Sequence, residues 1–196
     1  MKYALLSVSN KSGIVDFATG LVSAGYQIIS SGGTHAVLQA AGIPVMRVSD
    51  YTGSPEILDG RVKTLHPKIH GGILAQRNNS SHDLDRKVNR IELIDIVAVN
   101  LYPFKETVAK PDVTLEDAIE NIDIGRPSMV RSAAKNYKDV AVLTNPNQYG
   151  IYLDAINGNI SSVTPEQLRS QFAVEAFRHT AEYDTAINAW LEDRVL

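Results

Sequence analysis

The sequence predicts an α/β fold, a doubly wound and mainly parallel sheet of about five strands with helices on both faces, followed by a long C-terminal helix. Three observations predict this class. Short apolar runs alternate with helical patterns along most of the chain. The run at residues 94–101 is apolar enough for a strand that is buried on both faces, as in parallel sheets. With 196 residues, 44% of them hydrophobic, the chain can bury a substantial core.

The first half of the chain is predicted as strand, helix, strand, helix, strand. Residues 3–8 form the first strand, and a helix runs from Gly13 to a stop at Gly25. One face of this helix is apolar, with Ile14, Phe17, Ala18, Leu21 and Val22. The elements that follow are a strand at 27–30, a turn at 31–34, a helix at 36–41 and a strand at 45–48.

The second half supplies the remaining strands and two further helices. Residues 94–101 are the best candidate for a buried central strand, and residues 140–143 make a fifth strand. A helix over residues 114–122 opens with a Thr-x-x-Asp cap, and another over 127–136 starts at Pro127.

The C-terminal segment is predicted as a helix of its own. The motif TPEQ at residues 164–167 caps a helix over 168–191, whose buried face would include Phe172, Ala176 and Phe177. Residues 157–164 are the only plausible linker. The expected organisation is therefore one domain over residues 1–160 and a helical segment over 161–196.

Composition excludes several classes of protein. A net charge of −3 argues against a broad grip on nucleic acid and favours a small anionic ligand. Without cysteine there can be no disulfide, thiol nucleophile or cysteine metal site, and a reducing compartment is permitted. No signal sequence or membrane span is found, so we expect a cytoplasmic protein that binds neither membranes nor nucleic acid.

Polar loops follow the first two predicted strands. SVSNK at residues 7–11 offers hydroxyls, backbone N–H groups and one ammonium group, which suit a phosphate. In SGGT at residues 31–34, the glycines let the backbone approach an anion closely. Each loop alone could be an ordinary turn. Neither is a Walker loop or a G-x-G-x-x-G fingerprint, which disfavours nucleoside triphosphate hydrolysis and dinucleotide binding.

Residues 51–90 interrupt the alternation of strands and helices with a segment rich in Gly, His, Arg and Lys. Long excursions of this kind are usually functional or disordered. At its centre, GRVKTLHP (residues 60–67) brings two cations, a hydroxyl and an imidazole together, although a solvated basic loop is the alternative. His66 and His70 could share a helix face, but without an acidic partner or a third ligand we predict no metal site.

Three further side chains are candidates for chemistry. Tyr102 ends the most buried strand and could stabilise an oxyanion, although packing is the alternative. Asp123 lies between two branched aliphatic residues, so burial would raise its pKa, while a helix cap is the alternative. Lys135 ends the same helix, where a surface charge favoured by the helix dipole is the alternative.

Taken together and in this order, SVSNK, SGGT, GRVKTLHP, NLYPF, IDIG and AAKN resemble the inosine monophosphate cyclohydrolase domain of the bifunctional transformylase/cyclohydrolase of purine synthesis. The likeness covers essentially the whole chain, and AFRHTAEYD at residues 176–184 is similar to the helix that leads into the transformylase domain. The resemblance implies a methylglyoxal-synthase-like fold with Rossmann-like layers. It also implies a homodimer that is normally fused to a transformylase domain.

The resemblance implies that the chain dehydrates 5-formamidoimidazole-4-carboxamide ribonucleotide to inosine monophosphate with no metal and no cofactor. An amide nitrogen is a poor nucleophile and a formyl oxygen a poor leaving group, so the reaction needs proton removal and charge stabilisation. The family's catalytic residues match Lys63, Tyr102, Asp123 and Lys135. By this match, Lys63 and Tyr102 would stabilise the oxyanion at the formyl oxygen. Asp123 and Lys135 would manage the protons.

The same match predicts the residues that bind the substrate. Those that match the phosphate grip are Ser9, Lys11, Ser31 and Thr34. Those that match positions lining the base and ring are Arg61, Thr64, Asn100 and Gly125. Beside them, the residues also predicted to bind substrate are Ser7, Gly32, Gly33 and Ile124.

One departure from the family pattern concerns residue 126. The family usually has Ile-Asp-Ile-Gly-Gly, and this chain has Arg126 in place of the second glycine. If the position needs a positive φ, arginine carries a backbone penalty there. Its side chain could point outward, or it could enter the pocket beside Asp123 and lower the pKa of that carboxyl.

Two other functions remain open at this point. A methylglyoxal synthase acting on a triose phosphate has the same fold and could use the phosphate loops, but the 51–90 excursion and NLYPF argue against it. A noncatalytic nucleotide-binding regulatory module is the second alternative, and Arg126 is its only support.

Overall fold

A computed structural model, which describes residues 1–195, contains one five-stranded sheet in the order β3-β2-β1-β4-β5. All neighbouring strands are parallel. The strands are β1 (Lys2–Leu6), β2 (Tyr26–Ser30), β3 (Val45–Arg47), β4 (Ile94–Ala98) and β5 (Ala141–Leu143). The predicted α/β class and the parallel sheet are therefore confirmed.

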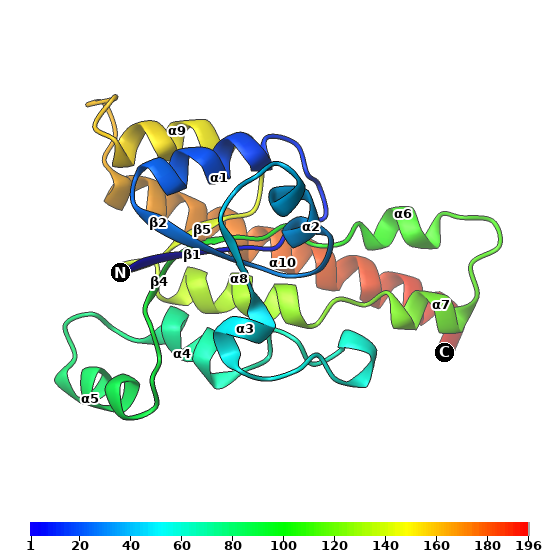
Figure 1. Cartoon of the computed structure of the whole chain (residues 1–196). Helices are drawn as coiled ribbons and strands as arrows, with labels where there is room; N and C mark the ends of the chain where they lie inside the picture. Colours follow the sequence, from blue (N-terminus) through cyan, green and yellow to red (C-terminus); the bar gives the residue numbers. More distant parts are fainter. Residues whose placement is uncertain (196) are drawn as a thin grey trace.

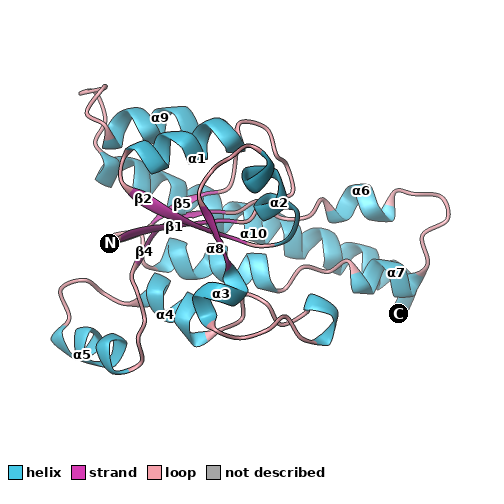
Figure 2. Cartoon of the chain, viewed as in Figure 1, coloured by secondary structure: helices cyan, strands magenta, loops and turns pink. Residues whose placement is uncertain are grey.

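Helices cover both faces of this sheet (Figures 1 and 2). The helices of the first half are α1 (Ile14–Ser23), α2 (Gly32–Ala40), α3 (Val48–Thr52), α4 (Pro67–Leu74) and α5 (Ser80–Val88). Those of the second half are α6 (Phe104–Val108), α7 (Leu115–Glu120), α8 (Gly125–Lys135), α9 (Gln148–Ile156) and α10 (Pro165–Val195). Helices α1 and α9 lie together on one face, and α4 and α8 lie on the other (Figure 1).

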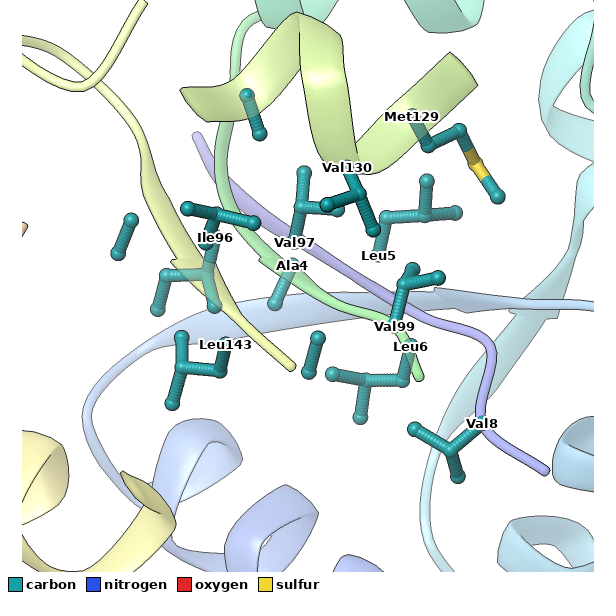
Figure 3. Packing of buried hydrophobic residues seen from close by; sticks show 14 of the residues in the cluster. Ala4, Leu5, Leu6, Val8, Ile96, Val97, Val99, Met129, Val130 and Leu143 are labelled. Atoms are coloured by element: carbon teal, nitrogen blue, oxygen red, sulfur yellow. The ribbon is translucent and has the colours of Figure 1, made fainter. Parts of the chain in front are cut away.

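The strands form where apolar side chains can be buried on both faces of the sheet. Figure 3 shows Leu5 of β1 beside Val130 of α8, while the next residue, Leu6, points to the opposite side. Leu5, Leu6 and Val130 are fully buried. Because successive side chains of a strand face opposite sides, a strand between two helical layers must be apolar at every position. This requirement explains why β4 is apolar apart from Asp95, which is partly exposed and pairs with Arg77.

Several boundaries differ from those predicted. The glycines at 32 and 33 do not form a turn but the first turn of α2, and Val48 begins α3 instead of ending a strand. Helix α8 begins two residues before Pro127, at Gly125. The expected buried interior strand is confirmed, because β4 pairs with β1 on one side and β5 on the other, while β1 lies in the middle of the five strands.

Residues 51–90 fold into short helices on one side of the sheet. They contain the end of α3, a 3-10 turn η1 (Leu58–Gly60), α4 and α5. Three consecutive residues of η1, Leu58, Asp59 and Gly60, have φ values of 52°, 54° and 87°. This left-handed region is unfavourable for leucine and aspartate, so the segment is strained.

Helix α10 has 31 residues and packs against α8, α9 and β5. Its buried residues include Phe172, Ala176, Tyr183 and Trp190. The prediction that Phe177 is buried is wrong, because its exposed fraction is 42%. The division into domains at residues 160 and 161 stays a prediction. No helix within residues 1–195 is long and apolar enough to cross a membrane.

Candidate active site

The loops that carry most of the predicted site residues meet at the carboxyl edge of the sheet. They follow β1, β2 and β4, and parallel strands place such loops side by side. A cavity of about 680 Å³ opens at this edge and is lined in part by Ser9, Asn100 and Tyr102. The site is therefore built where open α/β sheets usually bind ligands.

The N-terminus of α2 forms an anion-binding position. Ser31 is the N-cap residue in extended conformation, and no side chain of the described residues caps the first-turn N–H groups. A Cβ atom on Gly33 would lie 3.9 Å from Cε of Lys11, which places the lysine beside this turn. Burial, and secondly the charge of Arg126, lower the pKa of Lys11. Free N–H groups, the helix dipole and an ammonium group all attract phosphate here.

Two of the predicted phosphate ligands hold the loops together instead of leaving their hydroxyls free. The hydroxyl of Thr34 accepts from the N–H of Val8 and donates to the carbonyl of Val8, both at 3.0 Å. The hydroxyl of Ser9 lies 2.7 Å from Oδ1 of Asn100 and 2.8 Å from the carbonyl of Leu101. Thr34 therefore joins α2 to the loop after β1, and Ser9 joins that loop to the loop after β4.

Asn100 organises the loop after β1. Its Oδ1 accepts from the N–H of Ser9 at 2.7 Å, the N–H of Asn10 at 3.0 Å and the hydroxyl of Ser9. Because three donors surround this oxygen, the orientation of the amide is determined. Its nitrogen is buried and has no partner among residues 1–195. This leaves a donor next to the cavity that Asn100 lines.

Asp123, Arg126 and Tyr102 form one cluster at the N-terminus of α8. Oδ1 of Asp123 accepts from the backbone N–H of Arg126 at 3.0 Å, and its Oδ2 lies 3.4 Å from the Arg126 guanidinium. The same guanidinium stacks 4.1 Å from the centre of the Tyr102 ring. Asp123 therefore accepts from an N–H group in the first turn of α8, next to the N-cap residue Ile124, and also contacts a charged side chain.

The structure answers the question that Arg126 raised. Arg126 lies in the first turn of α8, and it is not among the residues with positive φ, so glycine is not required there. Its side chain turns inward and is only 15% exposed, next to Asp123 at 11%. Burial raises the pKa of Asp123 above its usual value, while the N–H and the charge of Arg126 lower it in part. A buried carboxyl of this kind suits proton transfer near neutral pH.

Tyr183 of α10 also contacts Asp123, and sequence reasoning missed it. Its hydroxyl accepts from the backbone N–H of Asp123 at 2.7 Å. Its ring is buried and meets Phe104 edge-on at 6.3 Å. Residue 183 lies in AFRHTAEYD, which resembled a connecting helix, and no pattern in that segment indicated a link to the site.

Gly125 is a glycine because Thr64 lies against it. A Cβ atom at position 125 would come within 2.8 Å of Oγ1 of Thr64, which is closer than real Cβ contacts. Thr64 is buried, so the segment at residues 60–67 is anchored on the first turn of α8. This contact brings two of the predicted ring-binding positions together.

The cations of this segment pair with acidic side chains. Nζ of Lys63 lies 2.7 Å from a carboxylate oxygen of Glu56, and Arg61 forms an ion pair with Glu120 at the end of α7. The Lys63 side chain is 24% exposed. Neither cation contacts Asp123 or Tyr102 within the described chain, and Ile124 is exposed. In this structure the Lys63 ammonium is paired with Glu56.

Lys135 is not brought together with the other predicted catalytic residues. It is exposed at the C-terminal end of α8, whose length puts it about 15 Å from the Asp123 end. The next residue, Asn136, donates to the carbonyls of Ile73 and Ala75 at the far end of α4. Lys135 therefore lies near the opposite edge of the sheet, at the beginning of β5.

The two histidines of the excursion have separate partners. Nδ1 of His66 accepts from the N–H of Lys68, and its Nε2 bonds to Ser54. Nδ1 of His70 bonds to the Ser132 hydroxyl at 3.1 Å. Within residues 1–195 no three side chains of the metal-binding types gather in one place.

A second cavity, of about 290 Å³, shares Thr144 and Asn145 with the first. It is bounded on α10 by Arg178, His179 and two glutamates. The sequence assigned none of these residues to a site, and His179 was expected to be an isolated surface or core residue. The position of Thr144 and Asn145 directly after β5 was the signal that could have found them.

Comparisons with known proteins agree with this architecture. A family model described as MGS-like domain matches residues 13–128, more than half of the chain, and one described as AICARFT/IMPCHase bienzyme matches residues 133–195. The chain is 61% identical over 192 residues to the bifunctional purine biosynthesis protein PurH of Synechococcus sp. (strain CC9605). It is 56% identical over 195 residues to PurH of Prochlorococcus marinus (strain MIT 9211). These matches cover 97% and 99% of this chain but 37% of each relative.

A solved structure, titled the crystal structure of ForH, superimposes with a TM-score of 0.83 at 35% identity, covering 95% of this chain and 97% of that one. The chain spans about a third of the length of the curated relatives. The resemblance drawn from the ordered motifs is confirmed. On the match to more than half of its residues, the chain belongs to the family of MGS-like domains.

Proposed function

We propose that this chain is an inosine monophosphate cyclohydrolase, which dehydrates 5-formamidoimidazole-4-carboxamide ribonucleotide to inosine monophosphate in purine biosynthesis. One observation carries the proposal: an anion position at the N-terminus of α2, beside Lys11, shares one edge of the sheet with the buried Asp123 carboxyl and Tyr102. An enzyme that transfers protons on the base of a ribonucleotide needs both a site for the phosphate and a proton-transfer group near the base. The PurH relatives, which are described as bifunctional purine biosynthesis proteins, support the assignment to this pathway.

The reaction requires one bond to form and one oxygen to leave. The carboxamide nitrogen bonds to the formyl carbon, and the formyl oxygen departs as water with one proton from the carboxamide nitrogen and one from the formamido nitrogen. We assign removal of the carboxamide proton to Asp123, because burial raises its pKa and makes it a stronger base than an exposed aspartate. The phosphate rests on α2 and Lys11, which fixes the ring relative to Asp123.

Negative charge develops at the formyl oxygen during the attack, and hydrogen-bond donors or cations must stabilise it. We assign this role to the Tyr102 hydroxyl, and to Lys63 once its ammonium leaves Glu56. Substrate binding supplies a new anionic partner that can compete with this half-exposed glutamate. The proton role that the resemblance gave to Lys135 is not part of this proposal, because Lys135 lies at the other end of α8.

The test is direct. Purified protein given the formamido ribonucleotide, with a chelator present, should form inosine monophosphate, measured by chromatography. No product, while a known cyclohydrolase is active in the same buffer, would refute the proposal. Methylglyoxal released from dihydroxyacetone phosphate would favour the synthase alternative. Tight nucleotide binding without turnover would favour the regulatory module.

We further propose that the active protein is a cytoplasmic homodimer in which this chain is joined to a transformylase domain. The bienzyme match at residues 133–195 and the bifunctional relatives support the fusion. Light scattering on the purified chain distinguishes a monomer from a dimer.

A further inference from the structure

The Arg126 side chain contacts both Asp123 and Tyr102. Its guanidinium lies 3.4 Å from a carboxylate oxygen of Asp123 and 4.1 Å from the centre of the Tyr102 ring. Both partners of this ion pair are at least 85% buried, so solvent screens the pair weakly. A planar guanidinium can pair with a carboxylate and stack on an aromatic ring at the same time, which an ammonium group cannot do.

The groups that face Asp123 come from three places in the fold, and a fourth group, Lys11, lies near Arg126. Arg126 approaches from α8, Tyr183 from α10 and Tyr102 from the loop after β4. Lys11, in the loop after β1, is near enough for the charge of Arg126 to lower the pKa of the lysine. Of these groups, Arg126 is the cation in direct contact with the carboxylate.

We propose that Arg126 is a positioning residue, which keeps Asp123 ionised and holds the Tyr102 ring beside it. This inference rests on the proposed function, in which Asp123 and Tyr102 act on the substrate. Without Arg126, burial alone would act on the carboxyl, so Asp123 would take up a proton at higher pH. The base would then be present as carboxylate in a smaller fraction of molecules at a given pH.

Three variants separate charge from stacking. Arg126→Gln removes the charge, and Arg126→Lys keeps the charge but loses the planar stack. Arg131→Gln is the matched control, because this substitution removes the same charge from the same helix. Arg131 does not face the Asp123 pair but lies 5.7 Å from the centre of the Phe177 ring. In each protein the aspartate carboxyl carbons are titrated by ¹³C NMR, with Asp123 assigned from an Asp123→Asn spectrum.

The expected result is a midpoint for Asp123 that moves to higher pH in Arg126→Gln and stays at the wild-type value in Arg131→Gln. The acid limb of kcat/KM for cyclisation should move in the same direction. Arg126→Lys should keep the wild-type acid limb but lose about tenfold in kcat, because small displacements of reacting groups slow catalysis strongly.

An Asp123 midpoint that is equal in Arg126→Gln and wild type, or that shifts equally in Arg131→Gln, overturns the electrostatic part. A wild-type kcat in Arg126→Lys overturns the part that concerns Tyr102. If the wild-type protein forms no inosine monophosphate, the proposed function fails, and the NMR titration still decides whether Arg126 keeps Asp123 ionised.

Discussion

Replacing Gly125 with alanine tests how the 60–67 segment is anchored. The new Cβ would lie 2.8 Å from Oγ1 of Thr64, inside contact distance, and Thr64 is buried. Overpacking of this kind costs about 1–3 kcal/mol. Alanine in place of glycine in a helix returns about 0.5–1 kcal/mol. We therefore expect Gly125→Ala to lower the free energy of unfolding by about 0–2.5 kcal/mol.

A double-mutant cycle isolates the contact. Thr64→Ala removes Oγ1 and makes room, whereas Thr64→Val keeps an atom in the same place. Urea denaturation should show that Gly125→Ala is destabilising in the wild-type and Thr64→Val backgrounds and neutral or stabilising in Thr64→Ala, a coupling of about 1 kcal/mol or more. An equal cost in all three backgrounds would refute the reasoning, because strain would then arise elsewhere.

Four further predictions concern the site. Asp123→Asn should abolish cyclisation. Because the pKa of Asp123 is raised in the folded protein, ionisation of this carboxyl destabilises the native state as the pH rises. The variant should therefore unfold at a higher urea concentration than wild type at pH 7, and this difference should disappear below the ordinary pKa of aspartate. Tyr183→Phe leaves the Asp123 N–H without its 2.7 Å partner and should cost about 1–3 kcal/mol of stability in the same assay. Lys11→Gln should raise KM for the ribonucleotide more than it lowers kcat, and steady-state kinetics with an unchanged KM would contradict the anion site. Lys135→Ala should keep kcat within about tenfold of wild type, because the residue lies at the far end of α8 from Asp123. A tenfold loss corresponds to about 1.4 kcal/mol of activation free energy. Complete loss of turnover would restore the catalytic role that the resemblance implied.

Much of the fold could be predicted because its signals are local. The apolar runs of β1 and β4 reflect burial on both faces, and Gly25 and the Thr114 cap mark helix ends directly. The assignment of residues 31–34 to a turn was wrong because glycine is normally a poor helix former, and here the helix starts on two of them. Propensity alone does not include the contacts of Thr34 with Val8 that hold this start in place.

The site was predictable where it depends on strand ends and not where it depends on distance across the fold. Asn100 and Tyr102 follow from the position of β4. The separation of Lys135 from Asp123 could be deduced only after both were placed at the two ends of one helix. Tyr183 lies 60 residues from Asp123 in the chain, and no local pattern reports such a contact. The sequence left open whether the Arg126 side chain points outward or inward, and in the structure it points inward and packs on the Tyr102 ring.

The contact between α10 and the backbone of Asp123 makes helix register a determinant of the chemistry. Sliding α10 by one residue would move Tyr183 by about 1.5 Å and turn it by about 100° around the helix axis. Either displacement would break a hydrogen bond of 2.7 Å. The side chains that set this register, such as Phe172 and Ala176, are buried about three and two turns along α10 from Tyr183. Substitutions there would alter turnover without touching any residue that meets the substrate.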